Sequence, residues 1–398
     1  MSGTYRQLPN GKWELGVSLG TSLSGKRIRK YKYVEAAGPR EAEKLLAEFI
    51  TESKRGDYAE GEKLLLKDFI ELWKKDYAEK NLRKKTLSRY KALLERIIFA
   101  LGHKKLSEIK PTHLLQFYRM LEEDGIRNDK IRVGKELVQK PGGLSPKTIR
   151  HHHALLSSMF QDAVEWGVIK ENICLRVKPP KVPKKETQFY TINQAQDLLD
   201  ALSREELKYR LLVILAIFTG FRRGEIMGLE WNDIDFKERT ISVRRSSQYT
   251  RDDGIYEDDT KTEKSKRAVF VPSFVIDLLT EYKAWWKRER NKAKEKWNET
   301  NRLFIQWNGL PMHPDTISQW FPEFIRKNKL PHVTYHGLRH THGSILLAMG
   351  MDLESVADQL GHNDIQMIIR TYGHNVRKRS RDAADHLTAA LLNKDTNT

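Results

Sequence analysis

Apolar residues recur at helical spacing in the last third of the chain, where short polar clusters interrupt them. The spacing predicts three consecutive helices. Gly361 is expected to stop the second, and Asn363 and Asp364 to cap the third. The apolar positions of the three helices are, in order, Ile345, Leu346 and Met349, then Val356, Ala357 and Leu360, then Ile365, Ile368, Ile369 and Tyr372. Packed together, these helices would bring one arginine, several histidines and one tyrosine to a common cleft.

The pattern changes along the chain. Residues 4–8, 13–19 and 27–33 read as short strands with turns between them, and an amphipathic helix over 39–53 would cover one face of their sheet. Residues 64–176 are helical throughout, apart from a charged insertion at 126–140. The chain from 186 onward predicts helices at 192–202 and 204–220, strands at 233–236, 240–244 and 266–272, and helices after 273.

These shifts predict a multidomain α+β protein. A small three-stranded sheet with one helix occupies 1–55, and a helical bundle occupies 63–178. A mainly α domain with a small antiparallel sheet occupies 186–398. The segment 178–185, with Pro179, Pro180 and Pro183, is interpreted as a stiff basic linker.

The charge composition indicates which kinds of partner the chain binds. The chain of 398 residues has 71 Lys+Arg against 53 Asp+Glu, a formal net charge of +18, which favours a polyanion such as nucleic acid. Cys174 is the single cysteine, which excludes a disulfide framework and suits a reducing cytoplasm. No apolar run is long enough for a membrane span, and the N-terminus has no signal-peptide core, so we expect a cytoplasmic protein without a membrane partner.

Polar residues with defined spacing fall in four places. The first stretch is Thr-Gly-Phe-Arg-Arg-Gly-Glu-Ile at 219–226, and the second is Thr-Lys-Thr at 260–262. His336-Gly-Leu-Arg339 and Leu360-Gly-His362 follow, and Tyr372 lies ten residues after His362. With its motifs in this order, nearly the whole chain resembles the tyrosine recombinases of the phage-integrase superfamily. It looks closest to integrases of phages and conjugative transposons of Gram-positive bacteria.

The resemblance implies a site-specific DNA recombinase that cleaves and rejoins strands through a 3′-phosphotyrosine, to integrate and excise a mobile element. The catalytic residues it implies are Arg222, Lys261, His336, Arg339, His362 and Tyr372. Lys264 and Lys266 compete with Lys261 for the role of general acid. Glu225, three residues after Arg222, is expected to orient it.

The chemistry fits these residue types. Two guanidiniums bind the non-bridging oxygens of a phosphodiester and keep their charge in the transition state. An aryl phosphate conserves the energy of the broken bond, so neither a cofactor nor a metal ion is expected. His336 can accept the tyrosine proton, because an imidazole titrates near neutrality. His340, His342 and His374 are interpreted as helix-end or surface residues. The run His151-His152-His153 is interpreted as a helix surface rather than a metal site.

DNA contacts are expected in two further places. The N-terminal sheet resembles the arm-binding domain of such integrases and carries Lys26, Arg27, Arg29, Lys30 and Lys32. The bundle resembles the core-binding domain, and Lys147 and Arg150 lie at the start of one of its helices. The expected partners are double-stranded DNA attachment sites and a homo-tetramer on DNA, with an excisionase or a host DNA-bending protein as further candidates.

Two alternative functions use the same fold. A DNA-binding regulator would retain the domains without catalysis, but all six catalytic positions hold the expected residue types. A topoisomerase-like enzyme would use the same tyrosine chemistry without defined sites, and the basic N-terminal sheet argues against it. Attachment-site sequence, the type of mobile element and the control of direction are left open.

Overall fold

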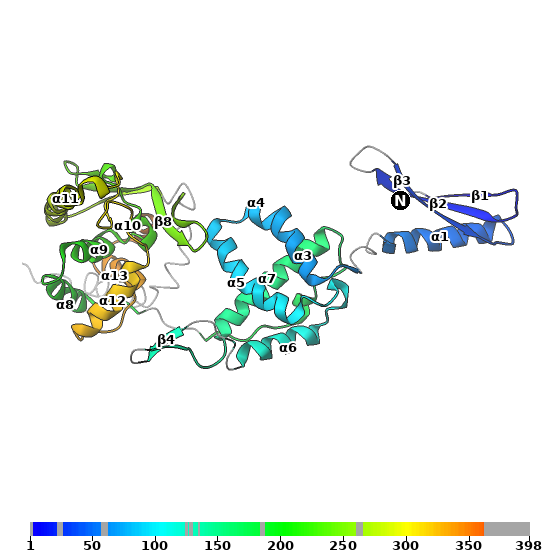
Figure 1. Ribbon diagram of the computed structural model, residues 1–398, viewed down its shortest axis with the longest axis horizontal. Coiled ribbons are helices and arrows are strands. Elements are labelled where there is room, and N and C mark those ends of the chain that lie inside the picture. Colours follow the sequence, from blue (N-terminus) through cyan, green and yellow to red (C-terminus); the bar gives the residue numbers. More distant parts are fainter. Residues whose placement is uncertain are drawn as a thin grey trace, which may run out of the picture. The chain divides into compact units, whose positions relative to one another are not determined.

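The computed structural model describes residues 3–21, 27–56, 63–123, 126, 130–133, 136–183, 188–259 and 266–361 (Figure 1). The chain divides into two compact units, Met1–Pro183 and Lys184–Thr398. The division falls within the segment interpreted as a linker. Each unit is described by itself.

The N-terminal element is an antiparallel sheet in the order β1-β2-β3, drawn in blue in Figure 1 with helix α1 along one face. Its elements are β1 (Gly3–Gln7), β2 (Trp13–Thr21), β3 (Arg27–Val34) and α1 (Pro39–Gly56). Leu15 and Val17 are fully buried and pack against Leu46 and Phe49 of α1. Because side chains alternate along a strand, the other face of the sheet stays uncovered by α1.

The rest of the first unit is a helical bundle with one apolar core. The core includes Trp73, Phe160 and Leu114 and buries the apolar stripes of four longer helices. Its elements are α3 (Leu66–Trp73), a π-helical turn (Lys74–Ala78), α4 (Glu79–Asn81), α5 (Lys84–Leu101), a 3₁₀ turn (Leu106–Glu108), α6 (Pro111–Glu122), α7 (Pro146–Glu165) and a 3₁₀ turn (Ile173–Arg176).

Two details of this bundle differ from the sequence interpretation. The charged insertion contains a hairpin, β4 (Lys130–Val133) paired antiparallel with β5 (Glu136–Gln139). His152 is completely buried, and its Nδ1 lies 2.9 Å from the carbonyl oxygen of Thr148. The interpretation of the three histidines as a helix surface is therefore wrong for His152. Burial lowers its pKa to about 4.

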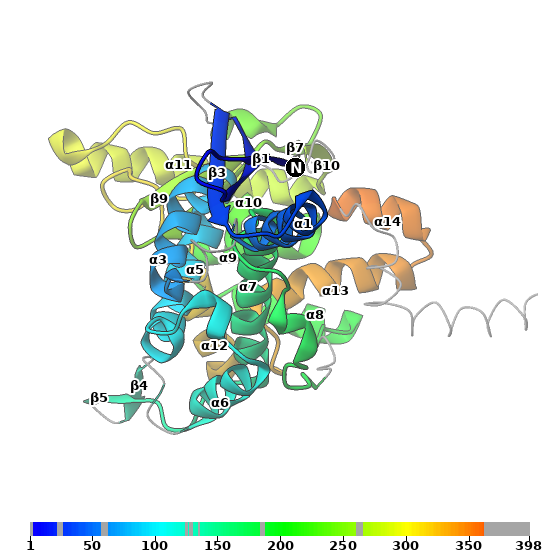
Figure 2. The ribbon, with the colours of Figure 1, turned by 90° about the vertical axis from the view of Figure 1, so that its right-hand side faces the viewer.

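The second unit is mainly helical. Its central helix is α9, whose run of apolar residues is buried nearly all round because α11 and α13 both pack against it. The helices are α8 (Ile192–Leu202), α9 (Leu207–Thr219), α10 (Arg223–Met227), α11 (Ser273–Ala293), α12 (Thr316–Lys327), α13 (Tyr335–Ala348) and α14 (Leu353–Leu360), with 3₁₀ turns at Trp231–Asp233 and Lys294–Lys296. Figure 2 shows α13 leading into α14.

A small antiparallel sheet completes this unit in the order β10-β7-β6, formed by β6 (Ile234–Asp235), β7 (Thr240–Val243) and β10 (Arg267–Phe270). Between β7 and β10, a separate hairpin pairs β8 (Arg245–Thr250) with β9 (Gly254–Asp259). The sequence did not predict this hairpin. The expected α+β architecture, with a basic N-terminal sheet and a mainly helical last domain, is confirmed.

Candidate active site

The turn between α9 and α10 positions Arg222. Gly220 ends α9 in the left-handed region, with φ of 63°, where glycine has no steric penalty. Thr219 stabilises this end, because its hydroxyl donates to the carbonyl of Leu215 at 2.6 Å and accepts from the N–H of Phe221 at 3.2 Å. Arg222 is then the residue that precedes α10, so its side chain projects from a helix start with a defined backbone.

Glu225 holds Arg222 from within the first turn of α10. Its Oε2 accepts from the backbone N–H of Arg222 at 2.8 Å, and its Oε1 accepts from Nη1 at 2.7 Å. Glu225 is 4% exposed. Burial alone raises the pKa of its carboxyl, but the charges of Arg267, Arg222 and Arg339 outweigh it and leave that pKa below its ordinary value. Glu225 is therefore a buried anion among three guanidiniums.

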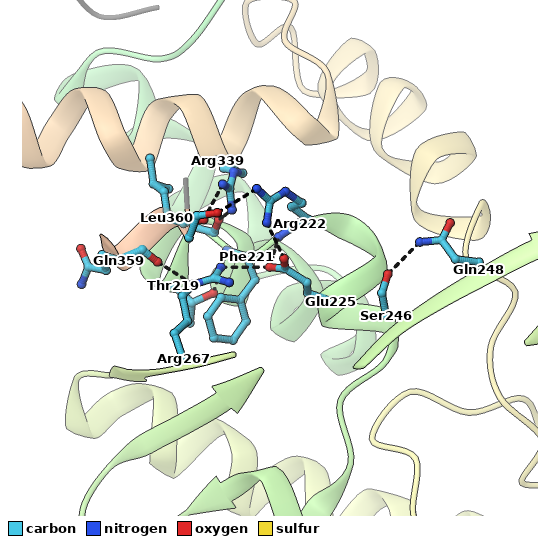
Figure 3. A network of polar contacts seen from close by, with 12 residues as sticks. Thr219, Phe221, Arg222, Glu225, Ser246, Gln248, Arg267, Arg339, Gln359 and Leu360 are labelled. Carbon is cyan, nitrogen blue, oxygen red and sulfur yellow. Dashed lines mark hydrogen bonds and ion pairs between the residues drawn. The ribbon is translucent and has the colours of Figure 1, made fainter. Parts of the chain in front are cut away.

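Arg339 approaches the same place from α13. Thr334 caps that helix by accepting from the N–H of Gly337 at 3.1 Å, which fixes the first turn. Arg339 is 2% exposed, and its Nη1 donates to the carbonyl of Gly220 at 2.7 Å. Figure 3 shows Arg222 and Arg339 side by side, next to Leu360 at the end of α14.

Both guanidiniums donate to the last carbonyls of α14. Nη2 of Arg339 donates to the oxygen of Leu360 at 2.5 Å, and Nη2 of Arg222 donates to that of Gly361 at 3.1 Å. Gly361 has φ of 62° and ends α14 in the left-handed region, as the sequence predicted. The end of α14 is thus bonded to both arginines, directly before the position of His362.

His336 lies one helical turn before Arg339 on α13. Its ring meets that of His340 edge to face, with centroids 5.1 Å apart. Partial burial, followed by repulsion from Arg339 and Arg222, lowers the pKa of His336, although the residue keeps an exposed edge. A neutral imidazole is therefore the main form of His336 at neutral pH, and this form can accept a proton.

The structure brings together Arg222, Glu225, His336 and Arg339 of the residues predicted from the sequence. Lys261, Lys264, His362 and Tyr372 lie outside the described residues, as does the third predicted helix. Lys266 is described, and it is exposed directly before β10. Among the residues that the structure describes, no group of histidines, cysteines and carboxylates could hold a metal ion.

Sequence reasoning gave no role to Arg267, which the structure places beside Glu225. Its Nη2 lies 2.9 Å from Oε2 of Glu225, and its Nε donates to the carbonyl of Gln359 at 2.7 Å. Period-two alternation along β10 was the available signal, because Arg267 shares a strand face with Val269 and Val271, both buried. Arg223 points away from this cluster and binds Ser318 and Asp315 of the α12 region.

His342 was interpreted as a helix-end or surface residue, and that interpretation is wrong. The residue is 6% exposed, and its Nδ1 lies 2.7 Å from the carbonyl oxygen of Ile217. A carbonyl only accepts, so Nδ1 carries a proton. Burial lowers the pKa of His342 to about 4. Its ring also lies against Gly220, where a Cβ would come within 2.5 Å of the ring Cδ2.

The residues predicted to bind DNA fall on different faces. Arg29 and Tyr31 lie on the sheet face away from α1, whereas Lys30 and Lys32 alternate to the α1 side, and the ammonium of Lys32 lies 5.6 Å from the Phe49 ring. Lys26 and the side chain of Arg27 lie outside the described residues. Lys147 and Arg150 are exposed in the first turns of α7.

Comparison with known proteins agrees with this geometry. Residues 188–379 match the phage integrase family, and residues 65–121 match the N-terminal SAM-like domain of phage integrases. A tyrosine recombinase XerC-like protein of Caldanaerobacter subterraneus is 26% identical, over 98% of this chain and all of that protein. The ICEBs1 integrase of Bacillus subtilis is 27% identical, over 63% of this chain and 67% of that protein.

Solved structures share the fold. The Tn1549 transposon integrase in complex with transposon right end DNA has a TM-score of 0.63 at 19% identity, over 81% of this chain and 100% of that one. A lambda integrase dimer bound to a core site has a TM-score of 0.56 at 15% identity, over 92% and 94% of the two chains. No helix among the described residues has the length and apolarity to cross a membrane.

A pair of guanidiniums oriented by a buried carboxylate is suited to bind an anionic phosphodiester and to stabilise the charge that develops on it. The chain belongs to the phage integrase family, whose members are tyrosine recombinases. The expected enzyme class, a site-specific recombinase that breaks and rejoins DNA strands, is confirmed.

Proposed function

We propose that this chain integrates and excises a mobile element by cutting and rejoining double-stranded attachment sites through a 3′-phosphotyrosine. Relatives named as integrases support the biological role, and so do structural neighbours solved with transposon right end DNA or with a core site. The observation that carries the proposal is the pairing of Arg222 with Arg339 around Glu225. Three guanidiniums around one carboxylate leave a net positive charge for an anionic phosphate.

The cleavage step assigns one role to each residue. The phenolic oxygen of Tyr372 forms a bond to phosphorus while the bond from phosphorus to the 5′ oxygen breaks. His336 accepts the tyrosine proton, and Lys261 gives a proton to the departing 5′ oxygen, with Lys264 and Lys266 as competitors. Arg222, Arg339 and His362 bind the non-bridging oxygens, on which charge builds up in the transition state. Attack by a free 5′ hydroxyl reverses the steps and joins the strands.

We assign DNA binding and catalysis to three domains. Residues 1–55 bind distal arm DNA, 63–178 bind core DNA, and 186–398 carry out catalysis. On the first, the sheet face opposite α1 supports DNA contact, because Arg29, Tyr31 and Tyr33 are exposed there. On the second, Lys147 and Arg150 lie at the start of α7. His151 follows Arg150, and partial burial and then the charges of Arg89 and Lys147 lower its pKa.

The complete reaction joins two duplexes, so we infer a homo-tetramer in which each protomer binds one half-site. An excisionase or a host DNA-bending protein would set the direction. The proposed substrates are double-stranded attachment sites, and we expect the reaction to take place in the bacterial cytoplasm.

A covalent-trapping experiment tests the proposal. A nicked suicide substrate, which loses the strand needed for rejoining, accumulates protein–DNA adducts with the unaltered chain. Tyr372→Phe removes the attacking oxygen with little change in volume, so binding is retained and the adduct disappears. The matched control is Tyr249→Phe, at a tyrosine that is 39% exposed on β8, and it keeps the adduct. Adducts that persist in Tyr372→Phe would disprove the assignment of the nucleophile.

A plasmid substrate tests site specificity. A supercoiled plasmid without attachment sites is expected to stay supercoiled with this enzyme, whereas a topoisomerase-like enzyme would relax it. Rapid relaxation of such a plasmid would replace the integrase proposal by the topoisomerase alternative.

A further inference from the structure

We propose that Arg267 is a positioning residue for strand cleavage. Through Glu225 it determines the position of Arg222 and how much of the Arg222 charge is neutralised. It also fixes the end of α14 at Gly361, directly before His362. This inference rests on the phosphate-binding roles proposed for Arg222 and His362. Figure 3 shows Arg267 below Arg222 and Arg339, with dashed lines that join Glu225 to Arg267 and to Arg222.

Arg267, on β10, contacts two segments that are distant from it in sequence, the start of α10 and the end of α14. Its side chain is 8% exposed. It pairs with Glu225 of α10 at 2.9 Å, donates to the carbonyl of Gln359 in α14 at 2.7 Å, and lies with Cζ 4.8 Å from the centre of the Phe221 ring. A planar guanidinium can make these contacts together because its donors diverge in one plane. Lysine has a single ammonium group and cannot reproduce this geometry.

Arg267 determines how much of the negative charge of the Glu225 carboxylate acts on Arg222. Oε1 of the carboxylate binds Nη1 of Arg222, and Oε2 binds both the backbone N–H of Arg222 and Nη2 of Arg267. One negative charge is therefore divided between two guanidiniums. Without Arg267, the buried carboxylate would pair with Arg222 alone and neutralise more of the charge that a phosphate needs.

Arg267 also holds the C-terminal end of α14 in place. A Cβ on Gly361 would lie 2.9 Å from Nη1 of Arg267, so the guanidinium packs directly against the residue that ends the helix. His362 is the next residue. The hydrogen bond to Gln359 and this packing together determine where the chain leaves α14. Loss of either interaction would release the end of α14, at Gly361, from its position relative to the two arginines.

A conservative substitution separates positioning from binding. In the full chain, Arg267→Lys keeps a positive charge but cannot bind Glu225 and the Gln359 carbonyl together. We expect single-turnover cleavage of a suicide half-site to slow by roughly 10- to 100-fold, a range typical when a group that supports a site residue is removed. Half-site affinity is expected to change by less than about twofold, since the buried Arg267 does not face DNA.

Two further measurements identify how Arg267 acts. The first is a double-mutant cycle with Glu225→Gln. If Arg267 works through Glu225, the double variant cleaves no more than about threefold more slowly than the slower single variant. The second is a substrate with sulfur in place of the 5′ bridging oxygen. A thiolate leaves without a proton, so this substrate restores a variant that lacks the proton donor, Lys261→Ala, and does not restore Arg267→Lys.

The results can overturn the inference in defined ways. Restoration of Arg267→Lys by the sulfur substrate would show that Arg267 serves the proton donor instead. If the fold-losses in cleavage rate of the two single variants multiply in the double variant, Arg267 acts independently of Glu225. If the cleavage rate falls only in proportion to the folded fraction of the protein, the role of Arg267 is purely structural. If Arg222→Lys also cleaves at the normal rate, the proposed function fails. If Arg222→Lys is defective and Arg267→Lys is normal, only this inference fails.

Discussion

Arg222 donates through Nη2 to the carbonyl oxygen of Gly361, 3.1 Å away, and so connects the start of α10 to the end of α14. The C-terminal carbonyls of a helix carry partial negative charge, which makes them suitable partners for a guanidinium. The sequence places His362 directly after Gly361, so we expect the contributions of Arg222 and His362 to catalysis to be coupled through this contact. A change at either residue is expected to alter the other's contribution to catalysis.

Replacing Arg222 tests the phosphate-binding role. Arg222→Lys keeps the charge but loses the forked donors, and we expect the barrier to cleavage to rise by about 2.7–4 kcal/mol, by analogy with the loss of one oxyanion donor. Single-turnover cleavage on suicide DNA measures the effect. Arg223→Lys is the matched control, because Arg223 binds Ser318 and Asp315 instead of the cluster. Equal rates for the two variants would contradict the assignment.

The N-terminal sheet is expected to add affinity without adding chemistry. Deleting residues 1–55 should leave cleavage of isolated core sites intact and weaken binding to long attachment DNA. The slope of log affinity against log salt should also decrease in proportion to the number of phosphates that the sheet neutralises. Unchanged slopes after deletion would rule out arm binding by this sheet.

Single substitutions can identify which sheet face binds DNA. Arg29 projects from the face opposite α1, and Lys30 projects from the α1 side. If the open face contacts the duplex, Arg29→Ala lowers the salt slope by about one and Lys30→Ala leaves it nearly unchanged. The reverse order would place the contact on the edge beside α1.

The chain after the nucleophile is expected to link protomers. Ala383, Ala384, Leu387, Ala390 and Leu391 would form an apolar stripe on a short helix, which is marginal alone and must bury that stripe. These residues lie outside the described part of the structure. Truncation after Arg379 should preserve binding of a monomer to one half-site and abolish tetramers on paired sites. Native mass spectrometry on attachment DNA that still detects tetramers would show that the helix packs within its own protomer.

Local sequence patterns correctly predicted the bounds of elements that pack one face against the core. Apolar spacing predicted α8 over the residues observed, and Gly361 ends α14 as expected. The contact between Arg222 and Glu225 followed from their spacing of three residues. Sequence patterns did not predict which residues are buried where neighbouring elements cover a helix on several sides. His342 is a polar residue, yet α13 is packed between α9, α12 and α14, so several of its polar residues, among them Thr341, His342 and Ser344, are buried as well.

Charged groups whose partners are distant in sequence were also beyond prediction. The role of Arg267 depends on Glu225 and Gln359, which come from other elements. The β8–β9 hairpin carries mostly polar residues, so its strands lack the alternation that identifies a half-buried strand. Only the three-dimensional arrangement supplies these partners.

The buried neutral His342 predicts a pH-dependent stability. Its pKa is about 4 in the folded chain, against about 6.5 when unfolded. The unfolded state therefore binds more protons between these values, so the free energy of unfolding decreases as pH falls from 6.5 towards 4, by up to about 3 kcal/mol. Denaturant unfolding of the last domain at pH 7.5, 6 and 5 measures the decrease. His342→Gln should be less stable at pH 7.5 and show a flatter pH dependence; an unchanged pH dependence would contradict this assignment.

Gly220 offers a test of the turn that positions both arginines. Its φ is 63°, and an added Cβ would lie 2.5 Å from Cδ2 of His342 and 2.7 Å from Cδ2 of Leu360. Gly254 is the matched control, since it has a similar φ of 68° in the β8–β9 turn with no atom within 4 Å of an added Cβ.

Each alanine substitution carries the backbone cost of the left-handed region, about 1–2 kcal/mol. Gly220→Ala carries in addition an overpacking cost of about 1–3 kcal/mol, because both neighbours are buried. Gly220→Ala also displaces the carbonyl that accepts from Nη1 of Arg339, so cleavage should fall further than the folded fraction does. Thermal unfolding and cleavage of both variants measure the two effects. Equal stability losses at Gly220 and Gly254 would mean that His342 and Leu360 move aside, and normal cleavage by folded Gly220→Ala would show that Arg339 does not depend on this turn.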